Sequence, residues 1–265
     1  MDNFSDNINK GIWLQKMKWK KVADYRNKGI GVILIPIGST EQHGYHLPLG
    51  TDTMVAIKLA EDAAKKTNTI VIPPLWFGWS PHHLALPGTI SIRAEVLIEV
   101  LFDIINSLSM HGFKNFVVVN GHRVVNIPWM QIAAERAQSK LHVKVEIFDP
   151  AWMIKDIAKE LDFPFLSHAD EIETSHLLYI NEDLVDLNMA VDYQPESERM
   201  HYSADPRSEK DTLCSVTKTI DDIKKIVKKS GGSVGRPSNA SKEKGKIMHE
   251  HLVRRLTEVI EELKK

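Results

Sequence analysis

The segment from residue 38 to residue 52 concentrates side chains that can bind metal ions. It contains Glu41, His43 and Asp52, and it follows an apolar run over residues 31–37 that predicts a strand. Glu41 and His43 point the same way if the chain stays extended, because side chains alternate along an extended backbone. Carboxylate and imidazole ligands without thiolate are typical of hydrolytic zinc, manganese or cobalt centres, and Asp52 could bridge two ions. The alternative interpretation is that Asp52 caps the helix that follows it.

A second cluster of candidate ligands spans residues 167–176. Acidic side chains in the first turn of a helix interact favourably with the helix dipole, and this explains Asp170 and Glu171 without a functional role. Glu173 precedes an apolar run where the helix would turn inward, and the pattern leaves open whether it is a ligand. A histidine that binds no metal, such as His168, could transfer a proton because its pKa lies near neutral pH.

The composition indicates a globular protein that acts on small molecules. A hydrophobic content of 43% in 265 residues allows a sizeable core, and we expect a single domain over residues 1–265. A formal net charge of -1 provides no basic face for nucleic acid or for an anionic membrane. The single cysteine, Cys214, excludes an internal disulfide framework and a thiolate metal cluster. The polar N-terminus and the lack of a long apolar run predict a cytoplasmic protein.

Short β-branched runs alternate with longer periodic runs along the chain. Strands are predicted over residues 31–37, 69–72, 115–119 and 143–148. Helices are predicted over residues 14–26, 53–66, 94–110, 127–139 and 151–161. This alternation predicts an α/β fold with a mainly parallel central sheet flanked by helices.

Both polar clusters of the first half are expected at the same edge of this sheet. Glu41 and His43 follow the first strand, and Asn120-Gly121-His122 follows the third. Ligands of open parallel sheets bind beyond the carboxyl ends of the strands. The sequence therefore predicts that these two distant segments meet at one site.

The second half of the chain is less regular. Residues 194–211 are polar and contain proline, which predicts a long loop or lid, and residues 229–239 form a turn-rich connection. A C-terminal helix is predicted over residues 240–263, with Ser238 or Asn239 as its cap.

Four motifs of this chain resemble those of the creatininase, or creatinine amidohydrolase, family of binuclear metal hydrolases. They keep the order of the family and spread over residues 31 to about 250. The resemblance implies a creatininase-like fold and a homo-oligomer, with a hexamer as the expected assembly. The motifs are Gly38–Gly44 with Asp52, His83 with Pro87–Thr89, Asn120–His122, and His168 with Glu173–Ser175.

The resemblance also implies two divalent metal ions, which would be zinc, manganese, iron or cobalt. Glu41, Asp52 and His122 would hold one ion, while His43 and Asp52 would hold the other, so that Asp52 bridges them. In creatininase, a glutamate two residues after the histidine that matches His122 completes the coordination of the second ion.

This chain departs from the family pattern at that glutamate. Val124 occupies its position and cannot coordinate a metal. Many other members have Gly-Gly-Asn after the histidine, and residues 123–126 here are Arg-Val-Val-Asn, which matches neither pattern. We expect Glu173 to replace the missing ligand.

The residues around the expected substrate also depart from creatininase. Pro164 stands where creatininase closes a tryptophan over its substrate, whereas Trp152 resembles the other active-site tryptophan of that enzyme. We therefore expect a substrate other than creatinine. His168 is the expected proton carrier, and Trp152, His83 and Arg123 are expected to contact the substrate, although Arg123 could instead form a structural ion pair.

Together these observations predict a metal-dependent amidohydrolase that cleaves a C–N bond in a small cyclic or linear amide. An alternative substrate is a lactone or a cyclic ketone with a sugar-like ring, since the same activated water would attack it. An alternative of another class is a catalytically silent member that serves as a binding or assembly protein. The altered residues after His122 are the feature that makes this alternative worth testing.

Overall fold

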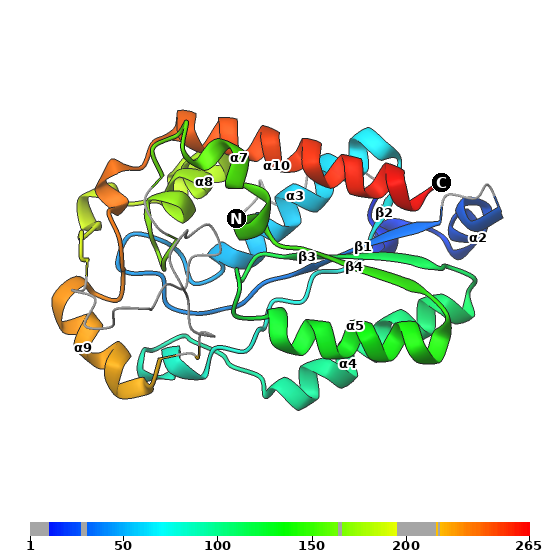
Figure 1. Ribbon diagram of the computed structural model, residues 1–265, viewed down its shortest axis with the longest axis horizontal. Helices are drawn as coiled ribbons and strands as arrows, with labels where there is room; N and C mark the ends of the chain where they lie inside the picture. The colour runs from blue at the N-terminus through cyan, green and yellow to red at the C-terminus, as the bar shows by residue number, and fades with distance from the viewer. Residues whose placement is uncertain (1–10, 28–30, 164–165, 195–215, 217) are drawn as a thin grey trace.

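The computed structural model describes residues 11–27, 31–163, 166–194, 216 and 218–265 of the chain. Within this part, parallel strands form a sheet in the order β2-β1-β3-β4 (Figure 1). The strands are β1 Val32–Ile37, β2 Ile70–Val71, β3 Asn115–Asn120 and β4 Lys144–Phe148. The predicted α/β class with a parallel sheet is confirmed.

Helices cover both faces of the sheet. Helices α3 and α10 lie over one face, and α4 and α5 lie over the other (Figure 1). Short 3-10 turns connect several of the elements. The α-helices are α2 Trp19–Asn27, α3 Thr51–Thr67, α4 Ala94–Met110, α5 Ile127–Leu141, α6 Pro150–Met153, α7 Lys155–Ala158, α8 Glu171–Asn181, α9 Ile220–Ser230 and α10 Lys242–Leu263.

The side chains of β1 explain why two core layers form. Val32 and Leu34 pack in the layer that includes α3 and α10, whereas Ile33, Ile35 and Ile37 pack in the layer that includes α4 and α5. All five are fully buried. Because each such side chain contributes about 1.5–3 kcal/mol when buried, a continuous apolar strand is stable only with a helix layer on each face.

Several element boundaries differ from the predictions. The helix predicted over residues 14–26 divides into a 3-10 turn and α2, because Met17 between them has an extended backbone. The helix predicted over 151–161 divides at Ile154 into α6 and α7. Ser241, and not Ser238 or Asn239, caps α10 by accepting from the amide of Lys244. Helix α9 was not predicted, and nearly all of the predicted loop over 194–211 lies outside the described residues.

The order of the strands creates a switch point between β1 and β3, where the chain leaves toward opposite sides of the sheet. Helix α3 begins at the carboxyl ends of these two strands and packs closely against both. A Cβ atom on Gly121 would lie 1.8 Å from the carbonyl oxygen of Asp52, and one on Gly38 would lie 2.3 Å from the amide of Thr53. Both positions therefore require glycine if the first turn of α3 is to approach the strands.

A buried polar chain joins three helices on the α3 face. Nε2 of His176 in α8 lies 2.9 Å from Nδ1 of His249 in α10, and Nε2 of His249 lies 3.1 Å from a carboxylate oxygen of Asp62 in α3. Because the carboxylate of Asp62 can only accept, His249 donates to it and accepts from His176. Burial raises the pKa of Asp62, but hydrogen bonds from His249, Lys58 and Lys65 lower it well below the usual range.

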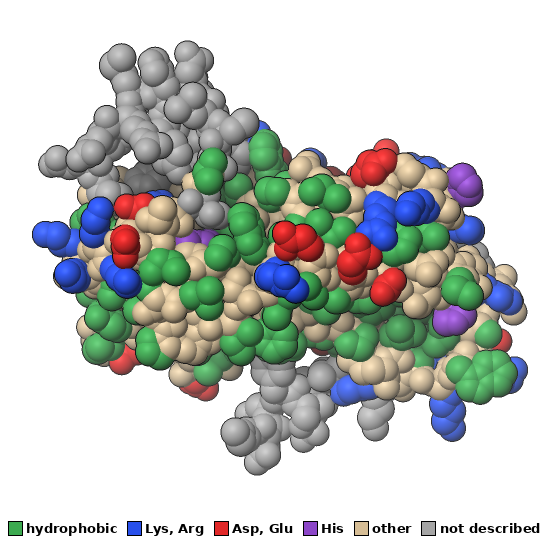
Figure 2. Space-filling view, turned by 90° about the horizontal axis from the view of Figure 1, so that it is seen from below, with side chains coloured by type: hydrophobic (Ala, Val, Ile, Leu, Met, Phe, Trp, Pro, Cys, Tyr) green, Lys and Arg blue, Asp and Glu red, His purple; other side chains and the backbone are tan. Residues whose placement is uncertain are grey.

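The opposite face of the molecule carries apolar side chains on its surface. Figure 2 shows them between groups of charged side chains on the face formed by α4 and α5. Val96 and Val100 of α4 and Ile132 of α5 are among the exposed residues. Exposed apolar patches often mark interaction sites, but the expected homo-oligomer stays a prediction. In the described part of the chain, no helix combines the length and the hydropathy of a membrane span.

We expect Asp62→Asn to lower the free energy of unfolding by about 1–3 kcal/mol at pH 7, the range for hydrogen bonds to charged groups. The folded pKa of Asp62 is depressed, so its contribution is present above the ordinary aspartate pKa and is lost as the pH falls through the folded value. The difference between wild type and variant should therefore shrink below about pH 4. Urea unfolding between pH 3 and pH 7 measures this difference in the free energy of unfolding, and Asp183→Asn, at an exposed position, is the control. A difference that does not depend on pH would contradict this account.

Candidate metal centre

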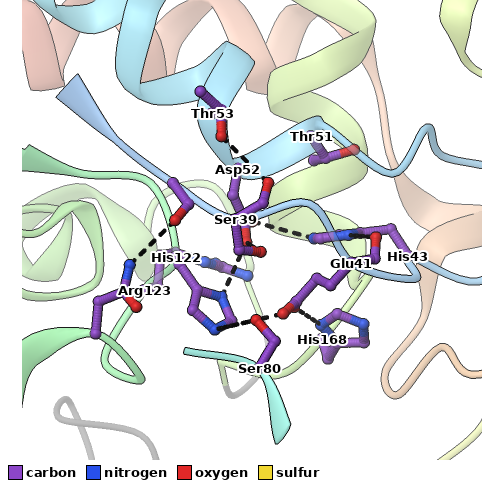
Figure 3. A network of polar contacts seen from close by, with 12 residues as sticks. Ser39, Glu41, His43, Thr51, Asp52, Thr53, Ser80, His122, Arg123 and His168 are labelled. Carbon is purple, nitrogen blue, oxygen red and sulfur yellow. Dashed lines mark hydrogen bonds and ion pairs between the residues drawn. The ribbon is translucent and has the colours of Figure 1, made fainter. Parts of the chain in front are cut away.

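The carboxylate of Asp52 lies between two histidines from different segments of the chain. Its Oδ1 lies 3.1 Å from Nε2 of His43, and its Oδ2 lies 2.9 Å from Nδ1 of His122 (Figure 3). Ser39 also donates a hydrogen bond to Oδ2 at 2.8 Å. Asp52 stands in the first turn of α3, and not at its cap, so the helix dipole adds to the stabilisation of its charge.

The buried charges of these residues shift their pKa values strongly. Burial lowers the pKa of His43, but the carboxylates of Asp52, Glu173 and Glu41 together outweigh burial and raise that pKa to about 10. Burial also lowers the pKa of His122, and Glu41 and Asp52 raise it to about 9. The pKa of Asp52 is held well below its usual range, because the two histidines outweigh burial. The site is therefore built to attract positive charge.

Glu41 has no exposed surface, and neither of its carboxylate oxygens has a hydrogen-bond partner among the described residues. The hydroxyl of Ser80 lies close enough to influence the pKa of Glu41. Three imidazole nitrogens also surround the carboxylate, with His122 Nε2 at 3.4 Å, His83 Nε2 at 3.6 Å and His168 Nδ1 at 3.7 Å. A buried carboxylate without partners is costly. A cation that bound Glu41 and a histidine at about 2.0–2.2 Å each would satisfy these separations. The residues present therefore fit a metal ion.

Glu173 approaches the same cluster from the first turn of α8. Its Oε2 lies 3.9 Å from Nε2 of His43 and accepts a hydrogen bond from the amide of Ala169 at 2.6 Å. Burial raises the pKa of Glu173, while Arg123 and His43 oppose this shift. The structure thus brings all five of the predicted ligands to one place, where the ends of β1 and β3 meet the starts of α3 and α8.

Among the residues that the structure describes, three overlapping groups of side chains could each hold a metal ion. Within each group the candidate ligand atoms all lie within 4.8 Å of one another. Two of the groups contain His168, so the geometry would also permit this residue to be a ligand, and its predicted role in proton transfer stays a prediction. The groups are Glu41 with Asp52 and His122, His43 with His168 and Glu173, and Glu41 with His83 and His168.

His168 is the least buried histidine of the cluster, with 20% of its side chain exposed. Its ring stacks on that of His83 with centroids 4.3 Å apart, and its Nε2 lies 2.7 Å from the carbonyl oxygen of Gln42. Burial and then the neighbouring His43 lower the pKa of His168 well below the usual value. The ring is therefore neutral at neutral pH, with Nδ1 toward Glu41.

Two residues of the site were not predicted from the sequence. Nε2 of Gln42 lies 2.9 Å from Nδ1 of His83 and 2.8 Å from Nε2 of His168, so Gln42 orients both rings. Asp149, directly after β4, accepts hydrogen bonds of 2.8 Å from the amide of Val124 and the side chain of Asn120. It thereby holds the turn that carries His122. Its position at the carboxyl end of a strand was the signal that could have identified it.

The predicted substrate contacts have different surroundings. His83 lies within the cluster, but the guanidinium of Arg123 pairs with Glu173 and Asp170. Trp152 is half-exposed beside a separate hollow of about 220 Å³, whose described lining includes none of the five predicted ligands. Contacts of Trp152 and Arg123 with a substrate stay predictions, and Pro164 lies outside the described residues.

Comparison with known proteins was made at the level of sequence and of structure. Residues 15–260 match the family model of creatininase, described as creatinine amidohydrolase. The 3-dehydro-scyllo-inosose hydrolase of Thermotoga maritima is 32% identical over 70% of this chain, and the match spans 61% of that protein. The creatinine amidohydrolase of Pseudomonas putida is 28% identical over 71% of this chain and 79% of that protein.

Other relatives and solved structures agree with these matches. The mycofactocin precursor peptide peptidase of Mycolicibacterium smegmatis is 34% identical over 58% of this chain and 60% of that protein. A crystal structure of creatininase superimposes with a TM-score of 0.78 and 25% identity over 95% of this chain and 97% of that chain. A manganese form of creatininase superimposes with a TM-score of 0.79 and 25% identity, over 95% and 98% of the two chains.

We expect zinc binding to this site to release protons and to tighten as the pH rises. The raised pKa values near 10 for His43 and 9 for His122 mean that both imidazoles are protonated at pH 7, and a metal must displace those protons. Affinity should rise roughly tenfold per pH unit for each displaced proton until the pH passes these values. Calorimetry in two buffers of different ionisation enthalpy measures the proton count. Binding that released no protons at pH 7 would contradict these assignments.

Proposed function

This chain belongs to the creatininase family, and we propose that it is a hydrolase with a binuclear metal centre that cleaves a C–N bond of a small cyclic or linear amide. The observation that carries this proposal is the position of Asp52. Each of its carboxylate oxygens faces a different histidine, as a ligand that bridges two cations would require. The unpartnered oxygens of Glu41 supply further ligand atoms on one side, and Glu173 supplies them on the other.

Glu41, Asp52 and His122 would hold the first ion, while His43, Asp52 and Glu173 would hold the second. When bound, the two ions would lower the pKa of a bound water to near neutral and would polarise a substrate carbonyl. We expect zinc, manganese, iron or cobalt. Zinc and manganese are supported by the solved creatininase structures, which include a two-zinc form and a manganese form.

His168 would carry the proton from the water to the departing nitrogen. Its neutral ring can accept a proton at Nδ1, which lies on the side of Glu41, when Nε2 donates its hydrogen to the carbonyl oxygen of Gln42. Its partial exposure leaves one edge of the ring accessible to a substrate. His83, stacked against it and held by the same Gln42, fixes the position of the ring.

Cleavage of a C–N bond is supported by the relatives named as an amidohydrolase and as a peptidase. A cyclic ketone or lactone is the second candidate substrate, and the relative named 3-dehydro-scyllo-inosose hydrolase favours it. Turnover of a panel of cyclic amides, short peptides, lactones and cyclic polyol ketones distinguishes these classes. Two ions per chain with turnover would support the enzyme, whereas one ion or none without turnover would support a catalytically silent binding protein.

We expect Asp52→Ala to lose both ions and all hydrolytic activity, because the bridging carboxylate belongs to both ligand sets. Metal content by plasma mass spectrometry after removal of free metal gives the result. Asp62→Asn is the matched control, since it alters another partly buried aspartate of the same helix, outside the cluster. Retention of both ions in Asp52→Ala would remove this residue from the site.

We expect His168→Ala to keep both ions and the fold but to reduce turnover by about 10²- to 10⁴-fold, the range for loss of a positioned general acid or base. The acid limb of the pH profile should shift or disappear in the variant. Steady-state kinetics on the best substrate of the panel, together with metal content, measure both effects. Loss of metal would make His168 a ligand, and near-normal turnover would leave it with a structural role.

A further inference from the structure

The turn that follows β3 has a backbone conformation that its sequence does not favour. Val124 has a φ of +64°, in the left-handed region that glycine adopts readily and that β-branched residues rarely adopt. Asp149 fixes this conformation by accepting the amide of Val124 at 2.8 Å, and it is itself almost fully buried. A conformation of this kind persists only where the surroundings impose it, and it directs attention to what the turn positions.

The turn positions the guanidinium of Arg123 against the first turn of α8. Nη2 lies 2.5 Å and Nε lies 3.0 Å from Oε1 of Glu173. Nη2 also donates to the carbonyl oxygen of Ser167 at 3.2 Å and lies 3.4 Å from Oδ1 of Asp170. Only 6% of the Arg123 side chain is exposed. The closest carboxylate to the guanidinium is therefore that of Glu173, with Asp170 as a second partner.

The second oxygen of Glu173 is oriented by these contacts. Because Arg123 holds Oε1 and the amide of Ala169 holds Oε2 at 2.6 Å, the carboxylate plane cannot rotate freely. In this orientation Oε2 faces Nε2 of His43 at 3.9 Å. Groups that hydrogen-bond to a metal-binding side chain fix the orientation of that side chain and tune the affinity of the site for the metal.

The space beside Arg123 is small, although Nη1 of Arg123 has no hydrogen-bond partner among the described residues. The cavity that Arg123 lines together with Asp52, Glu173 and His176 has a volume of about 20 Å³. A space of this size has room for one water molecule and not for a substrate. The described contacts of the guanidinium go to α8 and to the segment before it.

We propose that Arg123 is a positioning residue that holds Glu173 in the orientation in which it binds the second ion. The inference rests on the proposed binuclear centre. Arg123 and Val124 would then act together: the strained turn directs the guanidinium, and the guanidinium orients a carboxylate from another helix. A merely structural ion pair between Arg123 and Glu173 would leave metal binding unchanged when the arginine is removed.

The test is a set of variants titrated with zinc against a competing chelator, with cobalt absorption spectra as a second readout. Arg123→Met keeps the apolar part of the side chain and removes the guanidinium. It should lower the affinity for the second ion by about 10- to 100-fold and leave the affinity for the first ion unchanged. Glu173→Gln should empty the second site. Adding Arg123→Met to Glu173→Gln should then cause no further change in the binding of either ion. Arg136→Met, which breaks a surface ion pair with Glu99, is the control and should alter neither ion.

An unchanged or tighter second ion in Arg123→Met would overturn the proposal, and so would a further loss of metal in the double variant. If Arg123→Met does not fold, Arg123→Gln provides the same test, because its amide retains one donor and should weaken the second ion to a smaller extent. A wild-type protein that binds one ion or none would instead overturn the proposed binuclear centre. Two ions in wild type that persist in the arginine variants would overturn this inference alone.

Discussion

A carboxylate held between two imidazoles at the switch point of the sheet is the interaction on which the site depends. Asp52 reaches this position because α3 begins where β1 and β3 end, and because Gly38 and Gly121 let its first turn approach both strands. His43 and His122 come from the segments that follow those two strands. The parallel sheet therefore determines which parts of a long sequence can share one ion.

The surrounding structure accommodates an unusual concentration of buried acids. Glu41 and Asp52 have almost no exposed surface, and Glu173 is also buried. Groups of this kind are stable only with positive charge nearby, and the histidines and Arg123 provide part of it. The oxygens of Glu41, which have no hydrogen-bond partner among the described residues, are available to the proposed metal ion. The same buried charge that makes the site costly for folding would favour the binding of the proposed divalent ions.

Much of the fold follows from local patterns in the sequence, and the differences have physical causes. Short β-branched runs predicted each strand, and helix α4 was predicted with the observed bounds, Ala94–Met110. Helix α9 was missed although its first turn has a capping box between Thr219 and Asp222. The hydrophobic periodicity continues through Met17 and Ile154, although the backbone leaves the helical conformation there. Two helices were therefore predicted as continuous, because the sequence pattern does not report the tertiary contacts that end a helix.

The site could be predicted as a set of ligands but not as a network. Types and spacing of residues pointed to Glu41, His43 and Asp52, whereas the resemblance to the creatininase family implied the ligand role of His122 and led to that of Glu173; the fold brings all five together. The contacts of Gln42 with His83 and His168, and of Asp149 with the turn after β3, join residues far apart in the sequence, so no local pattern revealed them. The ion pair between Arg123 and Glu173 could not be predicted from the sequence for the same reason.

Anomalous diffraction from crystals grown with zinc tests the central claim most directly. The account predicts two anomalous peaks about 3.5–4 Å apart, with one carboxylate oxygen of Asp52 bound to each ion. A single peak, or two peaks of which only one contacts Asp52, would contradict it.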